Sequence, residues 1–374
     1  METNKVINVF YNNIKVGTLA LSKEKDVCFQ YDDNWIEDGF SINPFVLPLN
    51  KEVFVVNKPY FEGLFGVFSD SLPDAWGKLL LNRMLKQNKI NIKNINVLDK
   101  LAIVGTSGMG ALEYKPSYEF QQEIDTEFDL DTLSIECNKL LNTEFSNSLD
   151  ELFLLGGSSG GARPKILTKF SGEDWIVKFN TKLDGQNQGK MEYEYYLCAI
   201  KCGIKMMESK LLPSKISNGY FATKRFDRLN NKKVHTISVA ALLELDFQAP
   251  SLDYHSLMKL TKILTNNNYE DIEQMFKIMC FNVFAHNLDD HSKNFSFVYD
   301  EVTGMYRLSP AYDLTYSNTY FGEHTTSIDG NGKNITDNQL INVGVKAGIK
   351  KEKCLMIIEN IKSNVNEMLI EYLK

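Results

Sequence analysis

Three segments of the chain place acidic, amide and glycine residues at spacings that could transfer a phosphate. In the segment LDDHSKN, Asp289 and Asn294 stand five residues apart, which is the spacing of a kinase catalytic loop. A carboxylate at the first position can orient the proton of a substrate hydroxyl, and an amide oxygen at the second can bind Mg²⁺. Asp313, in LSPAYDL, follows nineteen residues after Asn294 and has the place of a second Mg²⁺ ligand.

The third segment is the run GGSSGGARPK, residues 156–165. Glycines let backbone N–H groups turn toward an anion without obstruction by a Cβ atom. A Walker loop is excluded because Ala162 stands where that motif requires lysine. The run therefore predicts a phosphate-binding loop formed by Gly157, Ser158, Ser159, Gly160 and Gly161.

Other interpretations of these segments stay open. The hydrolase pattern G-x-S-x-G occurs twice, centred on Ser158 and on Ser159, but that elbow leads from a strand into a helix, and here Pro164 and ILTKF follow. A flexible surface loop is a further alternative for this run. His286, Asp289, Asp290 and His291 could form a transition-metal site, although H-E-x-x-H is absent, or a hydrogen-bonded structural turn.

Lys178 lies in the apolar segment WIVKF, one predicted hairpin after the glycine run. A buried lysine requires an anionic partner, whereas a lysine on a solvent-facing edge does not. In protein kinases a strand lysine at this place holds the nucleotide phosphates and pairs with a helix glutamate. Glu192 and Glu194, at the start of the next predicted helix, are the candidates.

Apolar periodicity predicts the elements that position these residues. Strands are predicted as a hairpin over 5–21, as short segments within 26–60, and at 166–170, 175–179 and 219–225. Helices are predicted at 74–85 (capped by Asp70 or Ser71), 130–141, 191–202, 254–285 and 341–373. We predict an α+β class with a bilobal protein-kinase-like fold, divided into a small β-rich N-terminal domain (1–118), an N-lobe-like region (119–228) and a mostly helical C-lobe (229–374).

Composition limits the partners and the compartment. The net charge of −7, from 48 acidic and 41 basic residues, predicts that nucleic acid is reached only through a basic partner. The six cysteines are scattered without a C-x-x-C pair, which is typical of buried thiols in a reducing cytosol. We expect a cytoplasmic protein without membrane attachment, because neither a signal peptide nor an apolar stretch of about 18 residues is present.

The ordered motifs resemble the HipA family of bacterial kinases over nearly the whole chain. The resemblance rests on GGSSGGARPK, WIVKF, KRFDR at residues 224–228, FNVFAHNLDDHSKNFSF and LSPAYDL, and on VGTLAL, SINPFVLPL and FGVFSDSLPDAWG near the N-terminus. It implies a serine/threonine kinase that uses ATP and Mg²⁺ and is the toxin of a toxin–antitoxin pair. It also implies autophosphorylation of a loop serine, Ser158 or the adjacent Ser159.

The resemblance further assigns roles and partners. Lys178 would neutralise the nucleotide phosphates, and the backbone near Lys224 and Phe226 would meet the adenine edge. Asp289 would align the substrate hydroxyl. Asn294 and Asp313 would hold Mg²⁺. His291 stands where serine/threonine kinases usually carry lysine, so Lys293 is expected to supply that charge. A small helix-turn-helix antitoxin and a translation-related protein substrate are the implied partners. A pseudokinase that binds ATP without turnover is the main alternative.

Overall fold

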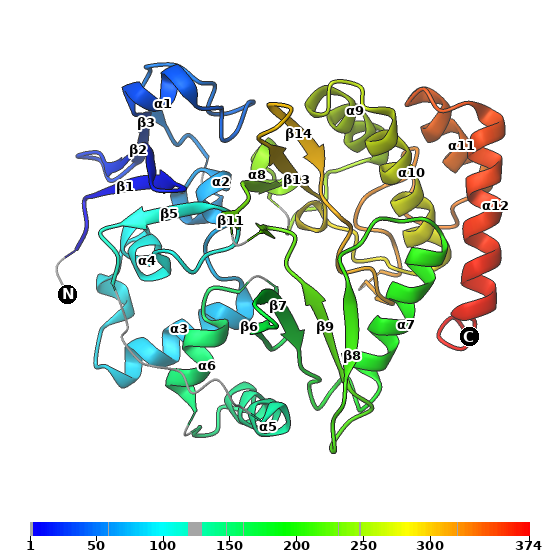
Figure 1. Ribbon diagram of the computed structural model, residues 1–374, viewed down its shortest axis with the longest axis horizontal. Helices are drawn as coiled ribbons and strands as arrows, with labels where there is room; N and C mark the ends of the chain where they lie inside the picture. Colours follow the sequence, from blue (N-terminus) through cyan, green and yellow to red (C-terminus); the bar gives the residue numbers. More distant parts are fainter. Residues whose placement is uncertain are drawn as a thin grey trace. The chain divides into compact units, whose positions relative to one another are not determined.

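The computed structural model describes residues 3–58, 60–118, 129–146, 148–159, 161–230, 232–246, 248–319 and 321–374. These residues form two compact units (Figure 1). Unit 1 comprises 1–189, 211–237 and 241–244, and unit 2 comprises 190–210, 238–240 and 245–374.

Unit 1 begins with an antiparallel sheet in the order β4-β3-β2-β1-β5. The predicted opening hairpin is confirmed, with Asn12 and Asn13 in its turn at φ of 47° and 66°, a conformation that asparagine tolerates well. The strands are β1 (Val6–Tyr11), β2 (Ile14–Leu21), β3 (Val27–Tyr31), β4 (Phe54–Val55) and β5 (Leu112–Lys115).

Helices surround this sheet and lead to the glycine loop. The predicted helix at 74–85 is confirmed as α3 (Ala75–Gln87), but the predicted cap was wrong. Asp74 is the residue at its N-cap, because Asp70 instead ends the short helix α2 and the Ser71 hydroxyl accepts a hydrogen bond from Tyr114 at 2.8 Å. The helices of unit 1 are α1 (Asp33–Asp38), α2 (Gly66–Ser69), α3, α4 (Val97–Val104), α5 (Leu130–Leu141) and α6 (Leu149–Gly156), with 3-10 turns at η1 (Phe61–Gly63) and η2 (Ile92–Asn94).

A second antiparallel sheet carries the lysine strand. Its order is β6-β7-β9-β8, and Trp175 and Val177 of β7 are buried against Trp76 and Leu80 of α3. The strands are β6 (Lys165–Phe170), β7 (Glu173–Lys178), β8 (Ser209–Leu212) and β9 (Tyr220–Lys224), followed by β10 (Arg228–Leu229), β11 (Lys232–Lys233) and β12 (Thr236–Ser238). The same apolar side chains that fix these strands also hold α3 beneath the glycine loop.

His235 is buried in unit 1 and makes stability sensitive to acid. Its Nε2 lies 3.0 Å from the carbonyl oxygen of Ile42, and burial lowers the pKa of the imidazole from 6.5 to about 4. Below pH 6.5 this histidine therefore binds a proton in the unfolded chain but not in the folded chain. As a result, the free energy of unfolding falls as the pH drops from 6.5 toward 4. We expect His235 to contribute about 3 kcal/mol to this loss. Urea unfolding at pH 7 and pH 4.5 should show a smaller difference for His235→Asn than for the wild type, and equal differences would contradict the assignment.

Unit 2 is mostly helical. The central helix α10 is buried through Met275, Phe276 and Met279 and packs against α9 and α12. The helices that lie wholly or largely in this unit are α7 (Gln188–Lys201), α9 (Tyr254–Leu264), α10 (Tyr269–Phe284), α11 (Asp337–Lys346) and α12 (Lys351–Met368), with α8 (Val239–Leu243) at the boundary. Strands β13 (Ser296–Asp300) and β14 (Met305–Leu308) pair as a hairpin, and η3 is Ser292–Asn294. This mixture of sheet and helix confirms the predicted α+β class.

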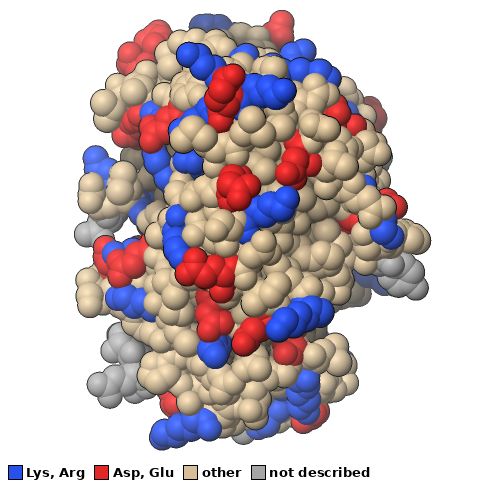
Figure 2. Space-filling view, turned by 90° about the vertical axis from the view of Figure 1, so that its right-hand side faces the viewer, with Lys and Arg blue, Asp and Glu red and all other residues tan. Residues whose placement is uncertain are grey.

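Two surface properties bear on partners. Basic and acidic side chains are interspersed on the face that Figure 2 shows, and Lys362 pairs with Asp337 at 3.4 Å and Lys353 with Glu273 at 3.3 Å. A surface of mixed sign does not favour direct binding to nucleic acid phosphates. In the described part of the chain, no helix combines the length and apolar character needed to cross a membrane.

Candidate active site

The glycine loop joins the end of α6 to the start of β6. The Ser158 hydroxyl donates to the carbonyl oxygen of Ser107 at 2.9 Å, and the Ser159 hydroxyl donates to that of Gly156 at 2.6 Å. Both serines are buried, with 7% and 1% of their surface exposed. The loop therefore runs from a helix to a strand, which is the reverse of the order that a hydrolase elbow needs.

Residues at the start of α3 support this loop. The Gly161 amide donates to the Asp74 carboxylate at 3.0 Å, and the Asp74 amide donates to the Ser159 carbonyl at 3.3 Å. A Cβ at Gly77 would come 2.8 Å from the Gly157 carbonyl oxygen, so glycine there permits the close approach of α3. Gly160 lies outside the described residues. The predicted loop residues 157–159 and 161 are thus brought together on the N-terminus of α3.

Lys178 ends β7 and is half-buried. Its ammonium lies 5.6 Å from the centre of the Phe221 ring on the neighbouring strand β9. Lys224 ends β9, and its ammonium is paired with Glu173 at 2.6 Å and lies 5.6 Å from the Trp175 ring. The side chain of Lys224 is therefore engaged on the sheet. The role expected for its backbone, beside adenine, stays a prediction.

A buried ion network follows directly after Lys224. The carboxylate of Asp227 accepts hydrogen bonds from Arg225 at 2.7 and 2.9 Å, from Arg228 at 2.8 Å and from the Gly110 amide at 2.7 Å. The two guanidinium groups also donate to the Gly108 carbonyl at 3.4 and 3.1 Å. We call Arg225, Asp227 and Arg228 the arginine–aspartate clamp. It connects β9–β10 to the loop before β5, a contact that sequence reasoning missed because Gly108 and Gly110 lie more than a hundred residues earlier.

The clamp is strongly electrostatic. Burial alone would raise the pKa of Asp227, but the two arginines and the Gly110 amide reverse this and hold the pKa below its ordinary value. The carboxylate is therefore ionised although only 1% of the residue is exposed. Phe226, between the clamp residues, is half-buried.

In unit 2 the predicted catalytic-loop residues follow the end of α10. The Asn294 side-chain amide donates to the Asp289 carbonyl at 2.6 Å, and the Asp289 amide donates to the Ser317 hydroxyl at 3.0 Å. His291 accepts a hydrogen bond from the Lys293 amide at 3.2 Å, and its Nε2 lies 3.9 Å from the Asp289 carboxylate. The Asp289 side chain is 59% exposed. Asp289 and Asn294 are thus joined by a direct contact, with the Asp289 side chain exposed to solvent.

A buried polar network ties this loop to the segment of Asp313. Asn287 donates to Asn282 at 2.9 Å and to the Asp313 carbonyl at 3.4 Å, and it accepts from Ser317 at 2.7 Å. Asp313 has a φ of 53°, a strained conformation for a non-glycine residue that recurs at functional sites. One asparagine thus positions the predicted base segment and the predicted metal-ligand segment together.

Asp290 differs sharply from its neighbour Asp289. It is fully buried, and its carboxylate accepts from Tyr254 at 3.0 Å, from His324 at 3.1 Å and from the Thr326 amide at 3.0 Å. Its role is therefore structural. Among the described residues, no group of three or more histidine, cysteine, aspartate or glutamate side chains could hold a metal, which counts against the transition-metal interpretation of this segment.

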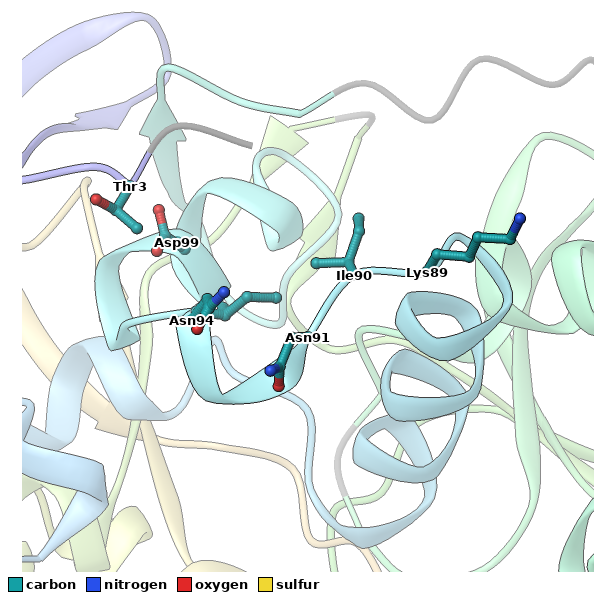
Figure 3. Close-up of a pocket in the computed structure, with 7 residues that line it drawn as sticks. Thr3, Lys89, Ile90, Asn91, Asn94 and Asp99 are labelled. Carbon is teal, nitrogen blue, oxygen red and sulfur yellow. The ribbon is translucent and has the colours of Figure 1, made fainter.

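A pocket of about 220 Å³ lies elsewhere in unit 1 (Figure 3). Thr3, Asn94 and Asp99 lie at one side of it, and Lys89 lies at the other with its ammonium directed away from them. The Asp99 carboxylate already accepts hydrogen bonds from the Asn4 amide at 2.7 Å and the Asn96 amide at 2.9 Å. None of the predicted site residues lines this pocket, so it has no part in the candidate site.

Comparisons with known proteins agree with the residue pattern. The family model described as HipA-like C-terminal domain matches residues 157–369, and the model described as HipA N-terminal domain matches residues 7–115. A curated protein of Sinorhizobium fredii (strain NBRC 101917 / NGR234), named "Putative kinase Y4mE", is 24% identical over 352 residues, which is 85% of this chain and 79% of that protein.

A solved structure confirms the fold. It is the Shewanella oneidensis MR-1 toxin–antitoxin complex of HipA, HipB and operator DNA, to which this chain is similar with a TM-score of 0.73 and 16% identity, over 98% of this chain and 90% of that one. The C-terminal family model alone spans more than half of the chain and begins at the glycine loop. The chain therefore belongs to the HipA family, as its motifs predicted.

Proposed function

We propose that this chain is an ATP-dependent kinase that phosphorylates serine or threonine in proteins, including Ser158 or Ser159 of its own glycine loop. The observation that carries the proposal is the 2.6 Å hydrogen bond from Asn294 to the Asp289 carbonyl. It fixes the backbone of Asp289, whose carboxylate is suited to orienting a hydroxyl, against the side chain of Asn294, whose amide oxygen is suited to a hard cation. The Sinorhizobium fredii relative named "Putative kinase Y4mE" supports the kinase part of this proposal.

Each residue then has a defined task. The loop amides and the Lys178 ammonium bind the nucleotide phosphates, and the backbone at Lys224 and Phe226 borders the adenine. Asp289 orients the substrate hydroxyl and accepts its proton, while His291, fixed by the Lys293 amide, stands beside that carboxylate. Glu192, which is 4% exposed on α7, and Lys293 are supporting residues.

The donor set in unit 2 fits Mg²⁺. Asn294 offers an amide oxygen and Asp313 a carboxylate, and Mg²⁺ in such sites takes one or two protein ligands together with phosphate oxygens and water. These two residues would hold the ion. When bound, it would neutralise the charge of the transferring phosphate.

The partners follow from the relatives. The Shewanella complex contains HipB and operator DNA, and we propose that a small helix-turn-helix antitoxin binds this chain and that its toxin activity is controlled in this way. Nucleic acid would be reached only through that antitoxin, because the chain itself carries a net charge of −7. The proposed substrate is a protein of the translation machinery.

Intact-mass measurement after incubation with Mg-ATP tests the kinase activity. We expect a gain of about 80 Da, one phosphate, located by peptide mapping of residues 152–165 and absent in Asp289→Ala. Because both serine hydroxyls are buried and hydrogen-bonded, the loop must open before either is modified, and the gain should build up slowly. Ser158→Ala and Ser159→Ala identify the acceptor. Wild-type protein that binds ATP but gains no mass would instead be a pseudokinase, and protein that does not bind ATP would refute the proposal.

A further inference from the structure

The helix α7 carries a buried tyrosine that reaches the start of the predicted catalytic loop. Tyr195 has none of its surface exposed, and its hydroxyl donates a hydrogen bond to the carbonyl oxygen of Ala285 at 2.9 Å. Ala285 is the C-cap of α10, and the segment that contains Asp289 and Asn294 follows it directly. Tyr195 therefore connects α7 to a segment that lies 90 residues later in the sequence.

The carbonyl of Ala285 lies where the chain leaves the helical conformation. The Ala285 amide still donates to the Phe281 carbonyl, whereas the next residue, His286, has a φ of 55°, in the left-handed region that ends the helix. Carbonyl groups in the last turn of a helix have no partner within the helix, so they are stabilised by donors from outside it. Without the Tyr195 hydroxyl, the peptide group between Ala285 and His286 would lose the donor that fixes its orientation.

The ring of Tyr195 is itself held by aromatic neighbours from two other segments. Phe281 of α10 contacts it edge-on, with 6.3 Å between the ring centres, and Tyr372, which follows α12, lies 5.9 Å away. The Tyr372 hydroxyl also donates to the carboxylate of Glu194, the residue before Tyr195 on α7. Tyr195 is therefore part of a rigid helix packed on both sides, which suits a donor that must hold a backbone group in one place.

We propose that Tyr195 is a positioning residue for phosphate transfer, which acts through the backbone of Ala285 on the placement of Asp289. The inference rests on the proposed function, since it adds a residue to the same site. The hydrogen bonds from Ser317 and Asn294 fix the Asp289 backbone within its own loop, and Tyr195 fixes the point at which this loop is joined to α10. A buried hydrogen bond also stabilises the fold, so the two effects must be separated by experiment.

The Tyr195→Phe variant, which keeps the ring and removes only the hydroxyl, tests the proposal. We expect the rate of ³²P transfer from saturating ATP to the protein to fall about 10- to 100-fold, because a displacement of about 1 Å in a reacting group costs this much. The affinity for ATP, measured by isothermal titration without Mg²⁺, should stay within about twofold of the wild type, since a loss confined to the rate marks an interaction that acts on the transfer step.

Tyr31→Phe is the matched control. Tyr31 is also buried, and its hydroxyl donates to the Leu47 carbonyl at 2.7 Å and accepts from the Ile42 amide at 3.2 Å. We expect this variant to lower the melting temperature at least as much as Tyr195→Phe and to leave phosphate transfer unchanged. In an Asp289→Asn background, Tyr195→Phe should change the residual transfer by less than about twofold, because coupled residues are not additive.

The outcomes distinguish this inference from the proposed function. Wild-type protein that transfers no phosphate would overturn both. An active wild type with equal transfer by Tyr195→Phe would overturn only the role of Tyr195. An equal loss of transfer in Tyr31→Phe, or a full further loss in the Asp289→Asn background, would also overturn it, because the hydroxyl would then act through stability or independently of Asp289. If Tyr195→Phe does not fold, the comparison is made in trimethylamine N-oxide, which favours the folded state.

Discussion

Asp289→Asn is expected to lower phosphate transfer by about 10²- to 10⁴-fold, the range for loss of a positioned acid–base group, while the protein stays folded. The hydrogen bonds that position Asp289 use its backbone, through the Ser317 hydroxyl and the Asn294 amide. Its side chain is 59% exposed. Removing the charge should therefore change the free energy of unfolding by no more than about 0.5 kcal/mol.

The neighbouring Asp290→Asn variant is the matched control. Its carboxylate is fully buried and accepts three hydrogen bonds, so the substitution should cost about 3 kcal/mol of stability. Transfer of ³²P from ATP to the protein and urea unfolding, measured on both variants, check the pair of expectations. Asp289→Asn with wild-type turnover would show that another group orients the hydroxyl, and a large loss of stability in that variant would show that its role is structural.

The sequence allowed the elements around the site to be predicted where the signal is local. Residues 130–141 and 166–170 have helical and strand-like apolar patterns, and the structure has α5 (Leu130–Leu141) and β6 (Lys165–Phe170) at these places. The helix α6 (Leu149–Gly156) was not predicted from the sequence. Its end at Gly156 determines how the glycine loop starts, so this omission left the conformation of the loop unpredicted.

Contacts between distant residues explain the rest. The sequence presents Asp289 and Asp290 as equivalent neighbours, and only Tyr254, His324 and Thr326, more than thirty residues away in the chain, bury one of them. The pairing of Lys165 with Lys178 was likewise not predicted, because it requires the register of β6 and β7. The predicted division into three domains and the roles of the site residues stay predictions.

Asp227→Ala is expected to destabilise the protein by about 3–5 kcal/mol, because removing one partner of a buried ion network leaves uncompensated charge. The guanidinium groups of Arg225, which is only 5% exposed, and of Arg228 would lose their shared carboxylate. The Gly110 amide would lose its acceptor. The clamp joins residues 225–228 to residues 108–110, and thus the two segments that the two family models match. We therefore expect the loss to affect both sheets of unit 1 together.

Glu173→Gln is the control for this experiment. Glu173 also pairs with a basic residue, Lys224, but its side chain is 55% exposed, and an exposed pair contributes at most about 1 kcal/mol.

The pH dependence gives a second criterion. Because the folded-state pKa of Asp227 is lowered, its contribution is complete at pH 7 and is lost only as the pH falls below about 3.9, the ordinary pKa of an aspartate. Urea unfolding at pH 7 that shows equal small losses for Asp227→Ala and Glu173→Gln would contradict the role of the clamp. A loss confined to Asp227→Ala would mean that the side chains of Arg225, Asp227 and Arg228 stabilise the fold by holding the N-terminal segment in place.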